Sequence, residues 1–290
     1  MNGEPTKVRD VLRGRHALVT GSSSGLGVEF ARELARRGCD LTLVARREDR
    51  LQALRQELCA RYGVKVFVVP ADLTAPGATQ RLYEEAKESG KPVDVLVNNA
   101  GFGIYGEAVE IPWEREKSML DLDIIALAHL TKLFAKDMLS RNFGFILQIA
   151  SIGAYQPSPT YASYSAAKSY VLHFGEALNY ELRNTGVSCT VLSPGISATE
   201  FLKVSGQQAS LYQRLVMMQP SKVARIGVES MLKRKMSVVP GRLNAATIFL
   251  NRILPRRLSA AISHRLMRDS KRRRSRWASV GPETTADREL

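Results

Sequence analysis

The sequence predicts an α/β fold in which a doubly wound parallel sheet of about seven strands carries helices on both faces and a C-terminal helical extension. Short apolar runs alternate with longer segments of helical periodicity along most of the chain. The short runs are almost unbroken in their apolar character, as is typical of strands that helices cover on both sides. The alternation therefore indicates a βα-repeating domain whose ligands bind beyond the carboxyl ends of its strands.

Each expected element has its own local signal. The expected strands are residues 16–20, 40–45, 64–70, 93–97, 145–150, 187–192 and 237–239. The expected helices are residues 26–37, 48–62, 78–89, 113–140, 161–183 and 220–235. Gly38 and Gly90 follow two of these helices, at the position where a glycine C-cap is common. Ser158 and Pro159 are start signals for the helix of residues 161–183.

Length and charge divide the chain into a body and a tail. We expect one domain over residues 1–270, with its core at about 12–240 and an amphipathic helical extension at about 242–268. Residues 271–290 begin with a basic run and end in a polar segment, which predicts a disordered tail. The formal net charge is +14, but no aromatic ladder or nucleic-acid motif accompanies it. A solvated tail is therefore favoured over a binding patch, and nucleic-acid binding is not expected.

The cysteines and the N-terminal residues bear on the compartment. Cys39, Cys59 and Cys189 form no CxxC pair and leave an odd thiol, which favours a reducing compartment over a disulfide framework. The four histidines are scattered, so no metal site is expected. Residues 1–10 lack the apolar core of a signal peptide, and no stretch reaches the ~20 apolar residues of a membrane span. We expect a cytoplasmic protein that is at most peripheral to a membrane.

A glycine-rich loop follows the first expected strand. The loop reads Thr20-Gly21-Ser22-Ser23-Ser24-Gly25-Leu26-Gly27 and leads into a helix. Glycines allow the backbone to approach a pyrophosphate closely, and the helix N-terminus offers free N–H groups to that anion. The spacing TGxxxGxG resembles the short-chain dehydrogenase/reductase family, which has a Rossmann-like sheet. The resemblance implies cofactor contacts by Gly21, Ser23, Ser24, Gly25, Leu26 and Gly27, the last of which lets the helix pack close to the sheet.

The end of the second strand predicts which nicotinamide cofactor binds. A dinucleotide fold that binds NAD has an acidic residue here, which bonds the ribose 2′-hydroxyl. This chain has Arg46 and Arg47 instead, and an arginine pairs with a 2′-phosphate. We therefore predict NADP(H), with Arg46 as the main discriminator. The alternative is that Arg46 is an ordinary basic residue at the start of a helix.

Three further loops resemble motifs of the same family. Asp72-Leu73 follows the third strand, where the family's Asp contacts the adenine, although Asp is also a common loop residue. Asn98-Asn99-Ala100-Gly101 matches the NNAG motif, which lines the cofactor floor. Ser193-Pro194-Gly195 resembles the PG motif, and a threonine that contacts the nicotinamide follows it. The resemblance thus assigns cofactor contacts to Asp72, Leu73, Asn99, Ala100, Gly101, Pro194, Gly195, Ile196 and Thr199.

The strongest signal is a serine, a tyrosine and a lysine in a fixed order. Ser151 follows the fifth strand, and Tyr164 and Lys168 lie four residues apart on one face of a helix. A lone YxxxK pair is weak evidence, but its order with the glycine loop, NNAG and Ser151 resembles the family's Ser-Tyr-Lys triad. The resemblance covers roughly residues 12–240.

These residue types suit proton transfer to a carbonyl oxygen. A free tyrosine has a pKa near ~10, and we expect the ammonium of Lys168 to lower the pKa of Tyr164. Tyr164 is then the acid/base, and Ser151 hydrogen-bonds the substrate oxygen. The resemblance implies that Tyr164 and Lys168 also contact the cofactor, with Lys168 on the nicotinamide ribose.

One position departs from the family pattern. Many members have an asparagine in the long helix after the fourth strand, and its backbone carbonyl holds a water in a relay from the lysine. Here the run Leu120-Asp121-Leu122-Asp123-Ile124 aligns Asp123 with that position. A buried carboxylate near Lys168 shifts proton affinities. Alternatively, a neighbour satisfies Asp123, and we do not count it among the catalytic residues.

The substrate side has weaker signals. We expect specificity to come from residues 153–159, from the segment after Glu200 and from the C-terminal extension. An apolar flap that closes over a substrate is one interpretation of the segment after Glu200, and ordinary packing is the other. Its apolar residues are Phe201, Leu202, Leu211, Tyr212, Leu215, Val216 and Met217. For the basic, amphipathic extension, packing on the body or on a partner subunit is favoured over contact with a membrane.

The sequence therefore predicts an NADPH-dependent reductase of a hydrophobic carbonyl compound, such as a 3-oxoacyl thioester or a bulky ketone. An alcohol dehydrogenase that works in the oxidative direction is the alternative among enzymes. A regulator or scaffold that binds the cofactor at an idle site is the alternative outside them. The resemblance also implies a homo-oligomer.

Overall fold

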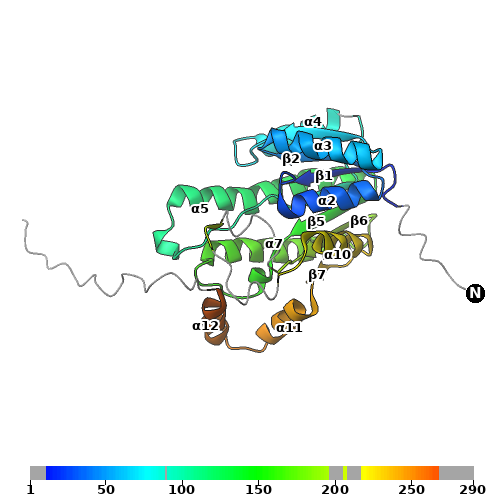
Figure 1. The fold of residues 1–290 in the computed structure, drawn as a ribbon. Helices are drawn as coiled ribbons and strands as arrows, with labels where there is room; N and C mark the ends of the chain where they lie inside the picture. The colour runs from blue at the N-terminus through cyan, green and yellow to red at the C-terminus, as the bar shows by residue number, and fades with distance from the viewer. Residues whose placement is uncertain (1–10, 89, 196–204, 208–216, 268–290) are drawn as a thin grey trace, which may run out of the picture.

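The computed structural model describes residues 11–88, 90–195, 205–207 and 217–267. These residues form one parallel sheet of seven strands, in the order β3-β2-β1-β4-β5-β6-β7 (Figure 1). The strands are β1 (His16–Thr20), β2 (Asp40–Ala45), β3 (Val66–Pro70), β4 (Val95–Asn98), β5 (Gly144–Ile149), β6 (Val187–Leu192) and β7 (Ser237–Val238). The strand order reverses between β1 and β4, and the crevice beyond such a switch point is where α/β sheets bind ligands.

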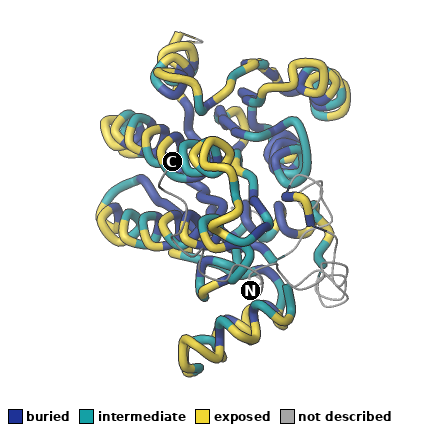
Figure 2. Tube along the Cα trace, turned by 90° about the vertical axis from the view of Figure 1, so that its left-hand side faces the viewer, coloured by how far each residue is buried: buried dark blue, intermediate teal, exposed yellow. Residues whose placement is uncertain are grey.

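Helices cover both faces of the sheet. The helices are α2 (Gly25–Arg36), α3 (Glu48–Tyr62), α4 (Ala78–Glu88), α5 (Trp113–Leu120), α6 (Leu127–Ser140), α7 (Ala162–Glu181), α10 (Pro220–Leu232), α11 (Arg242–Asn251) and α12 (Arg256–Met267). Apolar residues of α2, α3 and α10 pack on one face, and those of α4, α6 and α7 pack on the other. The predicted doubly wound α/β fold is therefore confirmed, and the central strands are buried as their apolar sequences require (Figure 2).

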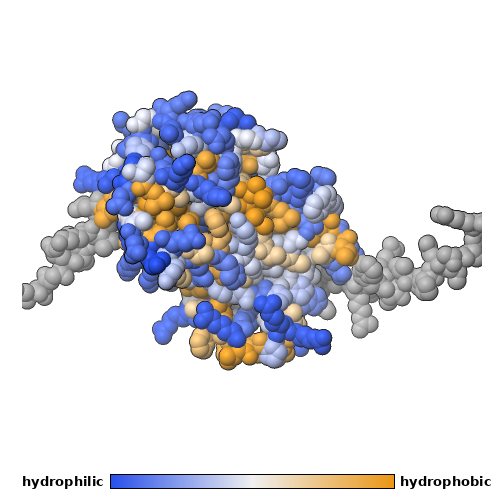
Figure 3. Space-filling model, turned by 180° about the vertical axis from the view of Figure 1, so that it is seen from behind, coloured by the Kyte–Doolittle hydropathy of each residue, from blue (hydrophilic) through white to orange (hydrophobic). Residues whose placement is uncertain are grey.

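The C-terminal extension differs from the rest of the fold. Helices α11 and α12 follow β7 and lie at the end of the molecule away from α3 and α4 (Figure 1). Apolar side chains gather on the surface at this end (Figure 3). Among the described residues, no helix combines the length and the apolar composition that crossing a membrane requires.

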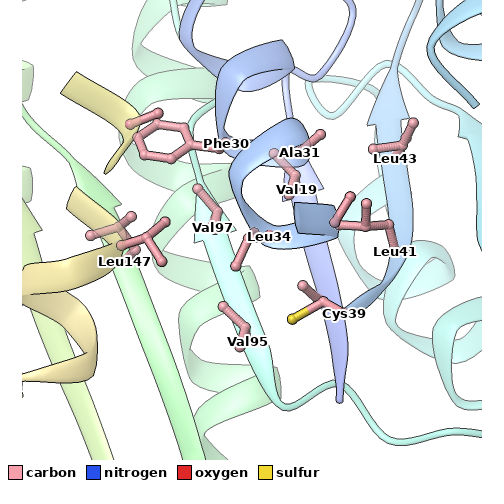
Figure 4. Packing of buried hydrophobic residues seen from close by; sticks show 14 of the residues in the cluster. Val19, Phe30, Ala31, Leu34, Cys39, Leu41, Leu43, Val95, Val97 and Leu147 are labelled. Atoms are coloured by element: carbon pink, nitrogen blue, oxygen red, sulfur yellow. The ribbon is translucent and has the colours of Figure 1, made fainter. Parts of the chain in front are cut away.

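Helix α2 illustrates how the core is built. Phe30 and Leu34 lie four residues apart on one face of the helix and are fully buried. They pack against side chains of the sheet, among them Val19 and Val97 (Figure 4). This packing holds the N-terminus of α2 at the carboxyl end of β1, which is where the glycine-rich loop lies.

One expected helix is interrupted. The sequence predicts a single helix over residues 113–140, whereas the structure has a π-helical segment, Asp121–Ala126, between α5 and α6. A π-helical turn inserts an extra residue into the turn, is rare, and is frequent at functional sites. This segment contains Asp123, which is fully buried.

Candidate active site

A pocket of about 600 Å³ lies at the carboxyl edge of the sheet, lined by loops that follow six of the strands. Most of the predicted site residues line it together. They are Gly21, Ser23, Ser24, Gly25, Leu26, Arg46, Asp72, Leu73, Asn99, Ala100, Gly101, Ser151, Tyr164, Lys168, Pro194 and Gly195. Ile196 and Thr199 lie outside the described residues. The long-range fold thus brings into one cavity motifs that are up to 174 residues apart, from Gly21 to Gly195.

The glycine-rich loop leaves no room for side chains at two of its glycines. Gly21 has φ +67°, and a Cβ there would lie 2.8 Å from the Cα of Ala100. A Cβ on Gly27 would lie 2.2 Å from the carbonyl oxygen of Gly21. Asn99 fixes the loop, since its Nδ2 donates to the Thr20 carbonyl at 2.9 Å. Gly27 does not line the pocket, so its contribution is the close packing of α2. The narrow, glycine-lined cradle fits the pyrophosphate of a dinucleotide.

The far end of the pocket is basic. Arg46 and Arg47 both line it, and Arg47 donates to the Ser23 hydroxyl at 3.1 Å. Asp72 lines the same end, where its carboxylate accepts from the Thr74 N–H at 3.0 Å and the Thr74 hydroxyl at 2.7 Å. Burial raises the pKa of Asp72, but these hydrogen bonds and the charge of Arg46 outweigh it and lower the pKa. Both arginines follow β2 in the sequence, with Arg46 as the expected discriminator, and both line the pocket.

The serine, tyrosine and lysine meet at the other end. The Ser151 hydroxyl accepts from the Gly153 N–H at 3.1 Å and is hydrogen-bonded to the Tyr164 hydroxyl. Lys168 lies one turn along α7 from Tyr164 and donates to the Ile149 carbonyl at 3.2 Å. Lys168 is almost fully buried, so its charge requires a partner.

That partner is Asp123. Its Oδ2 lies 3.0 Å from Nζ of Lys168, and the side chains are 0% and 6% exposed. Oδ1 accepts from the Phe102 N–H at 3.1 Å. A Cβ on Gly101 would lie 2.7 Å from this oxygen, so the glycine of NNAG makes room for the carboxylate. Burial raises the pKa of Asp123, whereas Lys168 and Phe102 oppose the rise. Of the alternatives for Asp123, the structure therefore has the residue buried and paired with the lysine of the triad.

The ion pair changes the expected electrostatics of Tyr164. From the sequence, Lys168 is expected to lower the pKa of this tyrosine. In the structure burial raises the pKa of Tyr164, Asp123 raises it further, and the hydrogen bond with Ser151 only partly opposes them. The ammonium of Lys168 lies 5.7 Å from the centre of the tyrosine ring, but Asp123 balances its charge. The sequence left a carboxylate near Lys168 as one of two alternatives, because Asp123 and Lys168 come from different helices and their distance depends on how these pack.

Beyond the triad, the pocket wall comes from segments that carry no motif. Tyr161, Gln207 and Met267 line the wall, and the Tyr161 hydroxyl donates to Oε1 of Gln207 at 2.8 Å. Nε2 of Gln207 donates to the carbonyl of Met267, the last residue of α12. Gln207 lies in the segment after Glu200 and Met267 in the C-terminal extension, two segments that the sequence predicts to set specificity. None of the three residues was predicted individually, since only the tertiary structure brings them together.

The outcome for the expected specificity segments is mixed. Of residues 153–159, Gly153 and Ser158 line the pocket. The proposed flap residues lie outside the described residues except for Met217, which does not line the pocket. No group of three or more His, Cys, Asp or Glu side chains within the described part of the chain is placed to hold a metal ion.

The comparison with known proteins decides the family. The family model for short chain dehydrogenase matches residues 15–210, which is more than half of the chain. The chain belongs to the short-chain dehydrogenase family. It is therefore an oxidoreductase of the class that interconverts hydroxyl and carbonyl groups.

Individual relatives show which activities and cofactors occur among similar proteins, but they do not identify the substrate of this chain. The chain is 32% identical, over 66% of its length, to a very-long-chain 3-oxoacyl-CoA reductase of Anas platyrhynchos, and the match spans 62% of that reductase. A short-chain dehydrogenase of Sphingobium yanoikuyae, solved with NADPH, has 28% identity and a TM-score of 0.74 over 83% of this chain and 96% of that one. A dehydrogenase/reductase of Burkholderia phymatum, solved with NAD, has 26% identity and a TM-score of 0.75, covering 82% and 93%.

Proposed function

We propose that this short-chain dehydrogenase is an NADPH-dependent reductase of a hydrophobic carbonyl compound, either a 3-oxoacyl thioester or a bulky ketone. The observation that carries the proposal is the composition of a single pocket. Ser151, Tyr164 and Lys168 line one end of it, and Arg46 lines the other. The identity to a long-chain oxoacyl reductase supports the substrate class.

The choice of NADPH depends on the basic end of the pocket. Structures of the family contain NADPH in one relative and NAD in another, so the family alone leaves the cofactor open. No Asp or Glu stands at the tip of β2 to bond a ribose 2′-hydroxyl. Arg46 and Arg47 offer guanidinium groups suited to a 2′-phosphate. The glycine-rich loop and the N-terminus of α2 would hold the pyrophosphate, and Asn99 and Lys168 would lie toward the nicotinamide half.

Residues of the chain itself supply the proton that the carbonyl oxygen of the substrate takes up. When bound, the reduced nicotinamide supplies the hydride for the carbonyl carbon. The Tyr164 hydroxyl donates a proton to the carbonyl oxygen, and Ser151 orients that oxygen with a hydrogen bond. Its raised pKa means that Tyr164 carries its proton at neutral pH, as the donor must. The direction of the reaction depends on the cofactor ratio in the cell.

The pocket wall supports a hydrophobic substrate. Tyr161 is buried and its ring packs 5.8 Å from the ring of Tyr164. Phe102 and Met267 line the same cavity and add apolar surface close to the triad. These side chains give an apolar ketone or acyl chain a place to be shielded from water.

A direct assay tests the proposal. Oxidation of NADPH by the purified protein is followed against 3-oxoacyl thioesters of increasing chain length and against bulky cyclic ketones. We expect turnover with one series, and its loss in Tyr164→Phe while NADPH still binds. No turnover across both series, with NADPH bound normally, would instead support a cofactor-binding regulator with an idle site.

A further inference from the structure

Helices α11 and α12 bury polar side chains and expose apolar ones, which is the reverse of what helices such as α2 do. Their buried residues are mostly small and polar, namely Asn244, Ser259 and Ser263, with Ile248 as the apolar exception. Polar contacts attach this side to its surroundings. The Asn244 amide donates to the Pro240 carbonyl at 3.0 Å, and the Asn251 amide donates to the side chain of Gln156. The polar side of the pair is therefore turned inward but only partly hydrogen-bonded, since Asn244 Oδ1 and the Ser263 hydroxyl have no hydrogen-bond partner in the part of the chain that the structure describes. Among the described residues, the apolar side is left exposed.

The uncovered side is strongly apolar. Leu243, Phe249 and Ile253 are 72%, 66% and 73% exposed. Together with three further exposed side chains they form what we call the outer face, which consists of Leu243, Phe249, Leu250, Ile253, Leu258 and Ile262. Figure 3 shows apolar surface at the lower end of the molecule, the end at which Figure 1 places α11 and α12. Large exposed apolar surfaces are uncommon on soluble proteins and commonly mark interaction sites.

The charge around the outer face selects among possible partners. The segment from Gly241 to Met267 contains five arginines and no Asp or Glu. All five are exposed, and they are Arg242, Arg252, Arg256, Arg257 and Arg265. A two-fold dimer through this face would bring together two copies of one positively charged patch, with no carboxylate of this segment to pair with the arginines. An anionic lipid surface instead offers negative headgroups to the arginines and an acyl boundary to the leucine, isoleucine and phenylalanine side chains.

We propose that the α11–α12 pair docks this protein on an anionic phospholipid surface, with the outer face in the headgroup region. The two helices have 10 and 12 residues, which suits binding in the plane of the interface. Met267 at the end of α12 lines the active-site pocket, so docking through α12 places that side of the pocket beside the lipid surface. The inference stands on the surface alone and does not depend on the proposed reaction.

Vesicle co-sedimentation of the full chain tests the proposal. The probes are vesicles of phosphatidylcholine alone and of phosphatidylcholine mixed with phosphatidylserine, at low and at high salt. We expect binding to the anionic vesicles only, and weaker binding at high salt because exposed charges are screened. Equal sedimentation with both kinds of vesicle, or with neither, would overturn the proposal.

Two double variants separate the apolar from the ionic contribution. Phe249→Ser with Ile253→Ser removes two exposed apolar side chains, and Arg256→Gln with Arg257→Gln removes two charges. Each basic residue near an anionic surface contributes roughly a factor of five in affinity, so we expect about 25-fold weaker binding for the arginine pair. For the apolar pair we expect at least a tenfold loss, because each side chain withdraws from the acyl boundary. Matched thermal unfolding curves check that both variants fold.

Controls distinguish this face from the rest of the basic chain. Arg55→Gln with Arg61→Gln removes the same charge from α3, on which both residues are exposed. We expect this control to bind within about twofold of the wild type, because the lost charges lie away from the lipid. Unchanged binding of the Phe249/Ile253 variant would transfer the activity to another basic segment and defeat the proposal. Self-association in the absence of lipid that the same variant abolishes would defeat it too, in favour of a second copy as the occupant.

Discussion

Helix α2 and the α11–α12 pair lie on the same body but place their side chains in opposite ways. In α2 the apolar Phe30 and Leu34 face the sheet. In α11 and α12 the side chains of Asn244 and Ser259 are buried, while Phe249 and Ile253 face outward. Apolar periodicity alone therefore shows that a helix has an apolar side, but not whether the protein itself covers that side.

The two regions also differ in whether their charged side chains are buried or exposed. At the sheet edge, Lys168 is buried and pairs with Asp123. In the extension the arginines are exposed, and no carboxylate occurs in the same segment. A buried charge requires a partner within the fold, whereas an exposed charge is free to meet an external one. The sheet edge thus holds a charge-balanced buried pair, whereas the extension presents exposed positive charge.

The largest expected effect tests whether the chemistry is confined to the sheet edge. Tyr164→Phe removes the proposed proton donor, and we expect turnover to fall about 10³-fold with little change in NADPH binding. Steady-state rates and fluorescence titration of NADPH measure the two quantities. Tyr180→Phe, in the exposed part of the same helix, is the matched control and should keep nearly full activity. Comparable losses in the two variants would contradict the assignment.

Stability measurements sharpen the contrast between the two kinds of helix. Leu34→Ala in α2 should lower the free energy of unfolding by about 2–5 kcal/mol, because it leaves a cavity in the core. Phe249→Ala in α11 should change it by no more than about 0.5 kcal/mol, because the side chain is already exposed. Urea unfolding of both variants gives the comparison. A large loss at Phe249 would mean that the outer face is covered within the protein.

Arginines in the two regions should differ in their effect on the cofactor. Arg46→Asp removes a charge-assisted hydrogen bond to the 2′-phosphate, so we expect NADPH affinity to fall about 10- to 100-fold more than NADH affinity. Arg256→Asp in the extension should leave the ratio unchanged. The dissociation constants of NADPH and NADH, measured for both variants, test this expectation. Equal losses of NADPH and NADH in Arg46→Asp would show that Arg46 does not recognise the phosphate.

The smallest expected effect concerns the buried ion pair. In alcohol oxidation Tyr164 accepts the proton as a phenolate, so the rate rises with pH through the pKa of Tyr164. Asp123 raises that pKa, and Asp123→Asn should therefore move the rise to lower pH. The midpoint of the rise is the readout, because the same change leaves the buried ammonium of Lys168 without its carboxylate partner and therefore also lowers the plateau.

A matched variant separates this effect from a general change in the helix. Asp121→Asn lies in the same π-helical segment, but Asp121 pairs with the exposed Lys117. Its pH–rate profile should coincide with that of the wild type. A shift to higher pH in Asp123→Asn, or the same shift in both variants, would refute the role assigned to the ion pair.

Local signals account for what could be predicted. The strands and helices from residue 16 to 238 follow the apolar periodicity, because each buried face repeats along its own element. The π-helical segment at Asp121–Ala126 was not predicted, since nothing in its composition distinguishes it from an α-helix. Likewise the glycine loop was recognisable from its spacing, whereas Gln207 and Met267 carry no local pattern.

By itself the sequence determined the α/β order of the elements, the loop beside α2 and the placement of Tyr164 and Lys168 on one helix face. These features depend on residues that are close together in the chain. Only the tertiary structure decided that Asp123 neutralises Lys168, that Tyr161 and Gln207 line the pocket and that the outer face of α11 and α12 is left uncovered. The physical reason is that these three features depend on contacts between segments that are far apart in the chain. Those contacts determine which side chains are buried and which charges are paired.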